Sequence, residues 1–336
     1  MKYDKVFMTS SPSFYKNKLF TEISNRIKIC VIFTGAAYHQ RNADFYKGEQ
    51  SFDNITLPKG LHNQIKVINA FLKENEFDEI VFGGWDTKIT WYAIFRTPKS
   101  KNSCIFESSI NESGTTGKKG LLKKLFLSRL HKAYPSGILQ SELLKALKFS
   151  GEIVEYGGCG ILNYQPQPAY EPRNEVKNFL FVGRLVPVKN LQLLISVFNK
   201  FPQFTLTIIG FGPLETELKE HANDNITFTG AINNADLPKF YQNADVFLLT
   251  SYSETWGLVV EEALNNGTPV IVSDHVGCHK DLVTPETGLV FKSNDETGLM
   301  EAVMKISDVK FYNTLREGVS KLDFNERAQR QIQSFI

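Results

Sequence analysis

The chain has 336 residues, of which 42% are hydrophobic and 12% aromatic, and a formal net charge of +2. That length exceeds what one hydrophobic core usually serves, so two domains are expected, while the apolar content excludes a disordered chain and the small net charge excludes a strongly basic nucleic-acid-binding protein. The charge is unevenly spread: residues 1–170 carry a net +8 (23 Lys and Arg against 15 Asp and Glu), and residues 171–336 carry a net −6 (15 against 21). This asymmetry also favours two domains with different surroundings.

The cysteines Cys30, Cys104, Cys159 and Cys278 are far apart in the chain and have no closely spaced His or Cys partner. A disulfide framework or a zinc site is therefore not expected, and a reducing compartment is. Residues 1–15 lack the apolar core of a signal peptide, and no stretch reaches the ~20 apolar residues needed to cross a bilayer. We therefore predict a cytoplasmic protein, with the inner face of the cytoplasmic membrane as the alternative location.

Short apolar runs alternate with amphipathic stretches throughout the first half of the chain. The runs predict strands at residues 5–9, 27–33, 80–82, 103–106 and 153–156. The stretches between them have apolar positions at helical spacing and predict helices at residues 14–25, 61–73, 88–95, 121–131 and 140–148. Residues 34–60 fit neither pattern and are interpreted as a long loop over the edge of a sheet.

The second half repeats the pattern more regularly, with predicted strands at residues 179–182, 206–209, 246–249 and 270–272, each followed by Gly, Ser or Thr and a helical stretch. These runs do not alternate in polarity, as expected for parallel strands that are buried on both faces. Strand, turn and helix repeated through both halves predict an α/β fold of two doubly wound domains.

The boundary between the domains is also visible in the sequence. Residues 157–174 contain three glycines and three prolines and show no periodicity, which is typical of a linker. We therefore predict an N-terminal domain at 1–156, a C-terminal domain at 175–322, and a last helix at 323–336 that packs back on the N-terminal domain.

Ligands of such sheets bind beyond the carboxyl ends of the strands, so the residues there are the candidate site. After the first strand of the second half come Gly183, Arg184 and Lys189, a glycine turn with two cations. Arginine supplies a planar fork of donors and lysine a mobile point charge, which suits a phosphate group; two solvated surface cations are the alternative. After the next strand, Gly210 and Gly212 would let the backbone approach a ligand, although such turns also occur without one.

A helix is expected to begin near Trp256 or Gly257, directly after the strand at 246–249. The first amides of this helix, those of Gly257, Leu258 and Val259, would then point out of its N-terminus with the positive end of the helix dipole. This arrangement predicts an anion site, and we place Trp256 in it as well.

Two glutamates flank this predicted anion site. Glu254 precedes the helix, and Glu262 lies about one and a half turns inside it. The carboxylates would bracket a bound diphosphate and accept hydrogen bonds from hydroxyls on either side of it. The alternative is that Glu254 caps the helix and Glu262 lies on a solvated face.

Five segments, read together, resemble the C-terminal, nucleotide-sugar-binding half of the family 4 retaining glycosyltransferases. They are FVGRLVPVKN, IIGFGP, FTGAI, NADVFLLTSYSETWG and EEALNNGTPVIVSD, which follow one another between residues 179 and 291. The resemblance implies the GT-B fold, in which two Rossmann-like domains face each other across a cleft.

The resemblance also implies roles for the two glutamates. The family signature, a glutamate followed after seven residues by a second glutamate, is matched by Glu254 and Glu262. The second glutamate of the signature is followed by alanine, and Ala263 therefore selects Glu262 rather than Glu261. In the family, the first glutamate contacts hydroxyls of the donor sugar and the second contacts the ribose.

By the same resemblance, Arg184 and Lys189 hold the diphosphate and offset the charge of the leaving group, and Ile232 is placed among the donor-binding residues. The implied reaction moves a sugar from a nucleotide diphosphate-sugar to a hydroxyl of a glycan or lipid-linked saccharide, in surface polysaccharide or lipopolysaccharide synthesis. Retention is implied to occur by front-face attack, with the diphosphate taking the acceptor's proton. The chain has no Asp-x-Asp sequence, so neither a metal ion nor another cofactor is expected.

The first half departs from the family pattern. Members commonly have a Gly-Gly loop after the first strand, where this chain has TSSPS at residues 9–13, and Ser11 is the candidate contact there. A His-containing pair is replaced by ESS, so Glu107 is the candidate for a catalytic or acceptor-side role. Trp85 could stack on an acceptor sugar and Asp86 could bind its hydroxyls; a buried tryptophan and a helix cap are the alternative.

Residues 118–132 form a basic amphipathic segment, which is either an ordinary surface helix or a patch for an anionic membrane surface. The positive first half favours the membrane, and a lipid-linked acceptor would suit such a surface. Two other functions stay open: a nucleotide-sugar epimerase of the same architecture, and a non-catalytic nucleotide-sugar-binding partner of another transferase. No nucleic-acid partner is expected.

Overall fold

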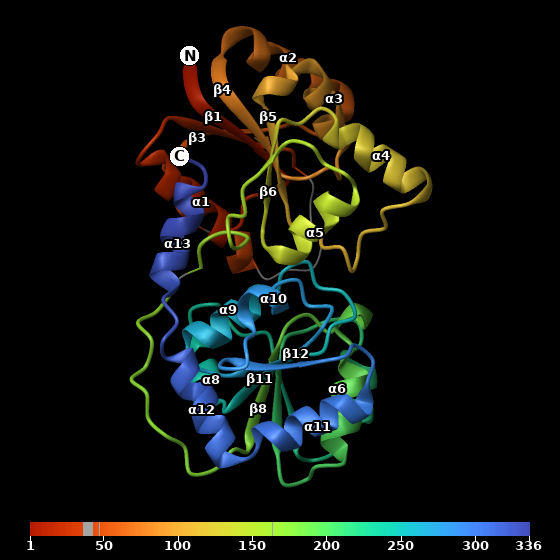
Figure 1. The fold of residues 1–336 in the computed structure, drawn as a ribbon, viewed down its shortest axis with the longest axis vertical. Coiled ribbons are helices and arrows are strands. Elements are labelled where there is room, and N and C mark those ends of the chain that lie inside the picture. The colour runs from red at the N-terminus through yellow and green to blue at the C-terminus, as the bar shows by residue number, and fades with distance from the viewer. Residues whose placement is uncertain (36–42, 47, 163) are drawn as a thin grey trace. The chain divides into compact units, whose positions relative to one another are not determined.

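The chain divides into two compact units in the computed structural model, which describes residues 1–35, 43–46, 48–162 and 164–336 (Figure 1). The N-terminal unit consists of Met1–Leu162 together with Glu326–Ile336, and the C-terminal unit consists of Asn163–Asn325. The division after Leu162 falls inside the segment that the sequence indicates as a linker, 157–174.

The N-terminal unit is built on a seven-stranded sheet with the order β3-β2-β1-β4-β5-β6-β7, in which the neighbouring strands pair in parallel. Its strands are β1 (Lys2–Thr9), β2 (Ile29–Phe33), β3 (Asp53–Thr56), β4 (Glu76–Phe82), β5 (Asn102–Phe106), β6 (Lys132–Pro135) and β7 (Glu152–Ile153). Every residue of β2 and the last four residues of β1 are buried. Such strands stand between helices on both faces, which explains their continuous apolar runs.

The helices of this unit are α1 (Phe14–Ser24), α2 (Leu61–Glu74), α3 (Lys88–Arg96), α4 (Gly117–Leu127), α5 (Ile138–Ala146) and most of α13 (Phe324–Gln333), with short 3₁₀ turns η1 (Ala43–Tyr46) and η2 (Lys99–Lys101). One core cluster joins the sheet to α2, α3, α4 and α5 through residues such as Phe82, Ile94, Phe126 and Leu143.

The segment Glu326–Ile336 completes the core of the N-terminal unit, and Figure 1 shows α13 beside α1. Phe335 is fully buried, with its ring centroid 4.7 Å from that of Tyr134, 5.6 Å from that of Phe7 and 5.3 Å from that of Tyr156. The Gln331 side-chain oxygen accepts a hydrogen bond from the Gly160 N–H at 3.0 Å. The end of the chain therefore supplies an aromatic ring, that of Phe335, to the core of this unit.

Two strands of the N-terminal unit, β3 and β6, are absent from the sequence-based prediction. The residues of β3, DNIT, are mostly exposed at the edge of the sheet, inside the segment interpreted as a loop. Strand β6 has only the four residues KAYP and ends in proline, a residue that is rare inside strands, so its sequence does not predict a strand. Residues 36–42 and 47 of the predicted loop lie outside the described residues.

The C-terminal unit has a six-stranded sheet with the order β10-β9-β8-β11-β12-β13, again paired in parallel. Its strands are β8 (Asn178–Val182), β9 (Thr205–Ile209), β10 (Ile226–Gly230), β11 (Val246–Leu249), β12 (Val270–Ser273) and β13 (Gly288–Phe291). Its helices are η3 (Pro187–Lys189), α6 (Leu191–Asn199), α7 (Glu215–Glu220), α8 (Leu237–Asn243), α9 (Leu258–Asn265), α10 (His279–Leu282), α11 (Glu296–Ile306) and α12 (Val309–Val319).

The strand order reverses once in each sheet, between β1 and β4 in the N-terminal unit and between β8 and β11 in the C-terminal unit. Parallel sheets bind ligands beyond the carboxyl ends of the strands at such reversals, because the flanking loops leave in opposite directions there. The residues at these four strand ends are therefore the first to examine for function. No helix in the described part of the chain is long and apolar enough to span a membrane.

Candidate functional site

The turns after β8 and β9 are packed directly against each other. The Gly183 N–H donates to the Ile209 carbonyl, and the Leu185 N–H donates to the Phe211 carbonyl, both at 2.9 Å. A Cβ atom on Gly210 would lie 1.8 Å from the Gly183 carbonyl oxygen, and φ of Gly210 is +139°. These contacts account for the glycines by packing between turns, so their contact with a donor stays a prediction.

Gly212 and Ile232 belong to the same row of strand ends. A Cβ atom on Gly212 would lie 2.4 Å from the Leu185 carbonyl oxygen, so this glycine is also required by the close approach of two chain segments. Ile232 follows β10, the strand next to β9, and is half-buried. Contact of either residue with a donor stays a prediction.

The side chains of Lys189 and Glu254 form an ion pair at the reversal point of the C-terminal sheet. Lys189 Nζ bonds to Glu254 Oε2, and the two side chains are 11% and 20% exposed. The Thr250 hydroxyl, at the end of β11, donates to the Lys189 carbonyl at 3.0 Å. Two residues that are far apart in the sequence are thus joined, and a ligand that engages either must compete with their ion pair.

Arg184 contrasts with Lys189, although both follow β8. Its side chain is half-buried and makes no hydrogen bond or ion pair with any residue that the structure describes. The turn that carries it is fixed by the main-chain bonds of Gly183 and Leu185 to the turn after β9. The turn thus holds the main chain of Arg184 in place, and the N–H donors of its guanidinium group are available to an anion.

Helix α9 begins at Leu258 and is capped by Gly257, whose φ is +105°. Glu254 is therefore not the helix cap, and the interpretation of Glu254 as a capping residue is excluded. Its main chain is held on both sides, since its N–H donates to the His275 carbonyl at 3.2 Å and its carbonyl accepts from Gly277 at 2.8 Å. The first-turn amides of α9, including those of Leu258 and Val259, lack partners within the helix, as at any helix N-terminus.

The Trp256 side chain is not available to a ligand. It is 1% exposed, and its indole N–H donates to Glu261 Oε2 at 3.1 Å. The predicted donor-binding role of Trp256 is therefore restricted to its main chain, because the ring is part of the core. Glu261 is fully buried beside it, which agrees with the choice of Glu262 as the second signature glutamate.

Glu262 is half-buried and accepts a hydrogen bond from the Tyr241 hydroxyl of α8 at 2.7 Å. Burial raises the pKa of Glu262 to about 7, the Tyr241 hydrogen bond opposes this shift, and the neighbouring Glu261 carboxylate adds to it. The carboxyl group therefore changes its charge near neutral pH. Tyr241 was not singled out from the sequence, where it precedes Glu262 with no motif to connect them.

In the N-terminal unit, Glu107 follows β5 and forms an ion pair with Lys16 of α1, with Lys16 Nζ 2.8 Å from Glu107 Oε1. Asp86 follows β4, the next strand in the sheet, and is exposed. Although part of Asp86 is open to solvent, partial desolvation of its carboxyl group, and then the Glu107 carboxylate, raise the pKa of Asp86, while Lys16 lowers it. Ser11 lies in the turn after β1 and is half-buried. The charges of Glu107 and Asp86 thus influence each other in the structure. Lys16 belongs to the same group of interacting charges and was not identified from the sequence.

The Trp85 ring is packed in the N-terminal core instead of standing free beside Asp86. Its centroid is 5.1 Å from that of Phe106 and 6.1 Å from that of Phe126, and Lys123 Nζ lies 5.4 Å from it. These contacts favour the packing alternative over stacking on a sugar. The helix-cap alternative for Asp86 fails, because Thr87 caps α3 by accepting from the Thr90 N–H at 3.2 Å.

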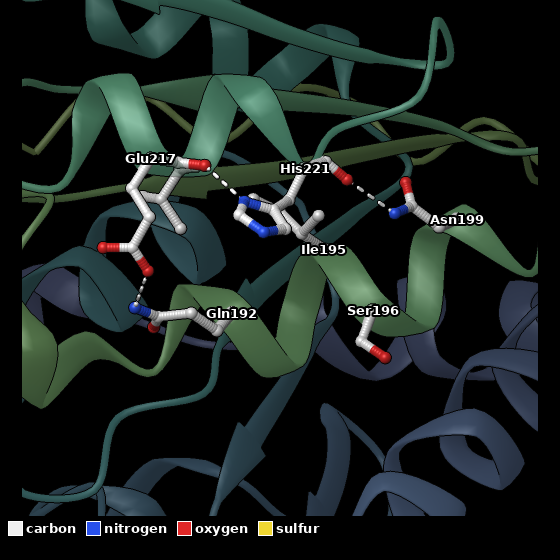
Figure 2. A pocket seen from close by; sticks show the side chains of 7 residues that line it. Gln192, Ile195, Ser196, Asn199, Glu217 and His221 are labelled. Atoms are coloured by element: carbon white, nitrogen blue, oxygen red, sulfur yellow. Dashed lines mark hydrogen bonds between the residues drawn. The ribbon is translucent and has the colours of Figure 1, made fainter.

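A groove of about 280 Å³ lies between α6 and α7 (Figure 2). Several of its polar groups are already paired: Gln192 donates to the Glu217 side chain at 3.3 Å, and Asn199 donates to the His221 main-chain carbonyl at 2.7 Å. None of the predicted donor or acceptor residues lines it. In the described ranges, there is no group of three or more His, Cys, Asp and Glu side chains that could hold a metal ion.

Residues 167–321 match the sequence model of the family described as glycosyl transferases group 1. This part of the chain is therefore similar to the group 1 glycosyl transferases. The match covers nearly all of the C-terminal unit, which contains Arg184, Lys189, Glu254 and Glu262. The resemblance to glycosyltransferases drawn from the sequence motifs is thereby confirmed.

Curated relatives match the same domain. The sulfoquinovosyl transferase SQD2 of Arabidopsis thaliana is 33% identical over 147 residues, which is 42% of this chain and 28% of that protein. The O-antigen biosynthesis glycosyltransferase WbnH of Escherichia coli is 36% identical over 121 residues, which is 35% of each chain. The matched stretch thus spans about a third or less of these two relatives.

Solved structures of glycosyltransferases match nearly the whole chain. A sucrose-phosphate synthase from Thermosynechococcus elongatus has a TM-score of 0.75 at 19% identity, over 97% of this chain and 94% of that one. The lipopolysaccharide outer core galactosyltransferase WaaB has a TM-score of 0.73 at 16% identity, over 100% of both chains. Anabaena Alr3699/HepE, solved with UDP and glucose, has a TM-score of 0.67 at 15% identity, over 99% of this chain and 97% of that one. The predicted GT-B fold class is confirmed.

Proposed function

We propose that the protein is a retaining, metal-independent glycosyltransferase that moves a sugar from a nucleotide diphosphate-sugar to a hydroxyl of a glycan or lipid-linked saccharide. The observation that carries this proposal is the ion pair of Lys189 with Glu254, just ahead of the N-terminus of α9, in the segment that matches the group 1 glycosyl transferases. Arg184 follows the same strand as Lys189. Surface polysaccharide or lipopolysaccharide synthesis is the setting, and UDP is the first nucleotide to test.

The chemistry needs positive charge where the leaving group forms. When the bond between the anomeric carbon and the diphosphate oxygen breaks, negative charge grows on the diphosphate. Arg184, Lys189 and the amides of α9 supply fixed positive charge at one place, which stabilises that transition state without a metal ion. Once Lys189 turns to the phosphate, the Glu254 carboxylate is released to accept hydrogen bonds from the sugar, and Glu262 takes the ribose.

The acceptor is assigned to the N-terminal unit. Asp86 and Glu107 offer carboxylate oxygens to sugar hydroxyls, and Ser11 adds a hydroxyl after β1. In this proposal the acceptor hydroxyl attacks the anomeric carbon on the face that the diphosphate leaves, and its proton passes to a diphosphate oxygen. No carboxylate of the protein has to act as a nucleophile.

Helix α4 supports contact with the inner face of an anionic membrane. Three of its four leucines, Leu121, Leu122 and Leu125, are 68%, 55% and 48% exposed, and Lys118, Lys119 and Lys124 are exposed on the same helix. Apolar side chains ringed by lysines suit a negatively charged lipid surface, where a lipid-linked acceptor is found. Sedimentation with vesicles containing phosphatidylglycerol, but not with phosphatidylcholine vesicles, would support this contact; equal sedimentation with both, or with neither, would contradict it.

The function is tested by incubating UDP-sugars with octyl glycosides in the presence of EDTA and analysing the products by NMR. A product in which the anomeric proton keeps the small coupling of an α-linked donor supports retention without a metal. An inverted product, or a requirement for a divalent ion, contradicts those details. Donor converted to its epimer without acceptor would indicate the epimerase, and tight UDP binding without any transfer would indicate the non-catalytic partner.

A further inference from the structure

Lys16 forms an ion pair with one carboxylate of the proposed acceptor side, that of Glu107, and acts electrostatically on the other, that of Asp86. Its Nζ is 2.8 Å from Glu107 Oε1, and its side chain is 14% exposed. The groups come from three places that the sheet brings together, since α1 follows β1, Asp86 follows β4 and Glu107 follows β5, and these strands are neighbours. Lys16 therefore shares one charged cluster with Asp86 and Glu107.

The charge on Lys16 is permanent in this position. Burial alone would favour the neutral amine, but the Glu107 carboxylate and the neighbouring Tyr15 raise the pKa of Lys16 above its usual range. The ammonium group also lies 6.0 Å from the centroid of the Tyr15 ring. A fixed cation next to two carboxylates neutralises one of them and lowers their mutual repulsion.

A buried hydroxyl marks the same strand ends. Thr9 ends β1 and is 5% exposed, and its Oγ1 would lie 3.0 Å from a Cβ atom on Gly83, in the turn that leads to Asp86. Within the described part of the chain this hydroxyl has no hydrogen-bond partner. Buried hydroxyls are seldom left without a partner, so this hydroxyl offers a hydrogen-bonding group to a polar ligand at the sheet reversal.

We propose that Lys16 is a positioning residue for the acceptor, which holds Glu107 in place so that Glu107 and Asp86 together accept hydrogen bonds from hydroxyls of the acceptor sugar. The inference rests on the proposed function and deepens it by naming the group that organises the acceptor side. Two carboxylates offer several acceptor positions for neighbouring hydroxyls, but only if they stay close despite their like charge. Lys16 acts through Glu107 and forms no bond with the substrate.

The test is a double-mutant cycle with Lys16→Met and Glu107→Gln, using UDP-glucose as donor and octyl α-glucoside as acceptor. Each single variant should raise the KM for the acceptor ~10-fold, with kcat and the KM for UDP-glucose changed less than ~3-fold. The double variant should be no worse than either single one, because both changes remove the same arrangement. Lys16→Arg should restore most of the acceptor affinity. Lys18→Met is the matched control, since Lys18 lies on the same helix but donates to the Leu162 carbonyl at 3.0 Å.

Independent losses that multiply in the double variant, or an equal change in the KM for UDP-glucose, would overturn the inference. An effect of Lys18→Met equal to that of Lys16→Met would do the same, because it would indicate general damage to α1. If the wild-type protein transfers nothing to octyl α-glucoside, the proposed function is in question. Saturation-transfer NMR of octyl α-glucoside then decides the inference separately. Binding to the wild type that is lost in Lys16→Met supports it; equal binding to both proteins, or no binding to the wild type, refutes it.

Discussion

The candidate residues of the C-terminal unit and those of the N-terminal unit are held in place by different kinds of contact. In the C-terminal unit, Gly183, Gly210 and Glu254 are fixed by main-chain contacts between neighbouring turns. In the N-terminal unit, the candidate groups are fixed by side-chain charge, above all by Lys16 and Glu107. The formal charges differ too: the N-terminal unit carries +9 (25 Lys and Arg against 16 Asp and Glu), and the C-terminal unit carries −7 (13 against 20). Close packing of the main chain requires particular residues, such as glycine, at fixed positions, and these residues form a motif that can be recognised in the sequence. An ion pair can be formed from many different positions and leaves no such motif.

The largest effect is expected from Glu254→Ala. This change removes the carboxylate of a residue whose main chain is hydrogen-bonded on both its N–H and its carbonyl. Loss of the contact to the donor sugar should lower kcat ~10³-fold while the circular dichroism spectrum stays unchanged. Glu175→Ala, at a side chain that is 67% exposed, is the control and should keep normal turnover. Near-normal turnover of Glu254→Ala would break the assignment of the C-terminal half.

A second prediction tests main-chain packing itself. Gly210→Ala should lower the free energy of unfolding of the C-terminal unit by about 3 kcal/mol, because the new methyl group collides with the Gly183 carbonyl and φ is unsuited to alanine. Gly114→Ala in the N-terminal unit, where a Cβ atom meets nothing within 4 Å, should change it by less than about 0.5 kcal/mol. Urea unfolding curves compare the two. Equal midpoints would mean that the turns after β8 and β9 are looser than described.

The third prediction separates the two cations after β8. Arg184→Met should weaken UDP binding ~10-fold, because it removes one free cation. Lys189→Met should weaken it ~100-fold, because the Glu254 carboxylate is then left uncompensated beside the diphosphate. Adding Glu254→Gln to Lys189→Met should recover part of the loss in calorimetric titrations. Unchanged UDP affinity in both single variants would reject the phosphate clamp.

The smallest effect concerns pH and Glu262. The ribose contact needs the ionised carboxylate, so affinity for UDP-glucose should rise ~5-fold as the pH increases from about 6 to about 8, through the pKa of about 7. Tyr241→Phe should move the midpoint to higher pH, because the Tyr241 hydrogen bond lowers the pKa of Glu262. Glu262→Gln should abolish the dependence. UDP-glucose is the ligand because, unlike UDP, its diphosphate has no group that titrates in this range.

Much of the C-terminal half could be predicted from the sequence because its chemistry is carried by turns. The apolar runs of β8, β11 and β12 predict strands, and the residues that follow each strand fall where a parallel sheet binds ligands. Sequence could not foresee that Lys189 and Glu254 pair with each other, or that Tyr241 bonds to Glu262. These partners are remote in the chain and come together only when the sheet forms.

Prediction was weaker in the N-terminal half for the same physical reason. Asp86 and Glu107 were found because they follow strands, but Lys16 has the appearance of any helical surface lysine until its ion pair is known. For Trp85 the sequence left stacking on a sugar and packing in the core as alternatives, and the contacts with Phe106 and Phe126 favour packing. Burial of a side chain depends on its neighbours in space, which one sequence does not give.

The packing of Phe335 in the core of the N-terminal unit has a consequence for biosynthesis. The N-terminal unit draws its core from both sides of the C-terminal unit in the sequence, because Phe335 packs on Phe7, Tyr134 and Tyr156. A nascent chain therefore exposes these rings to the ribosome surface and to chaperones until the whole C-terminal unit has been translated. The C-terminal unit is contiguous and can fold as it emerges, so the part that is made first is completed last.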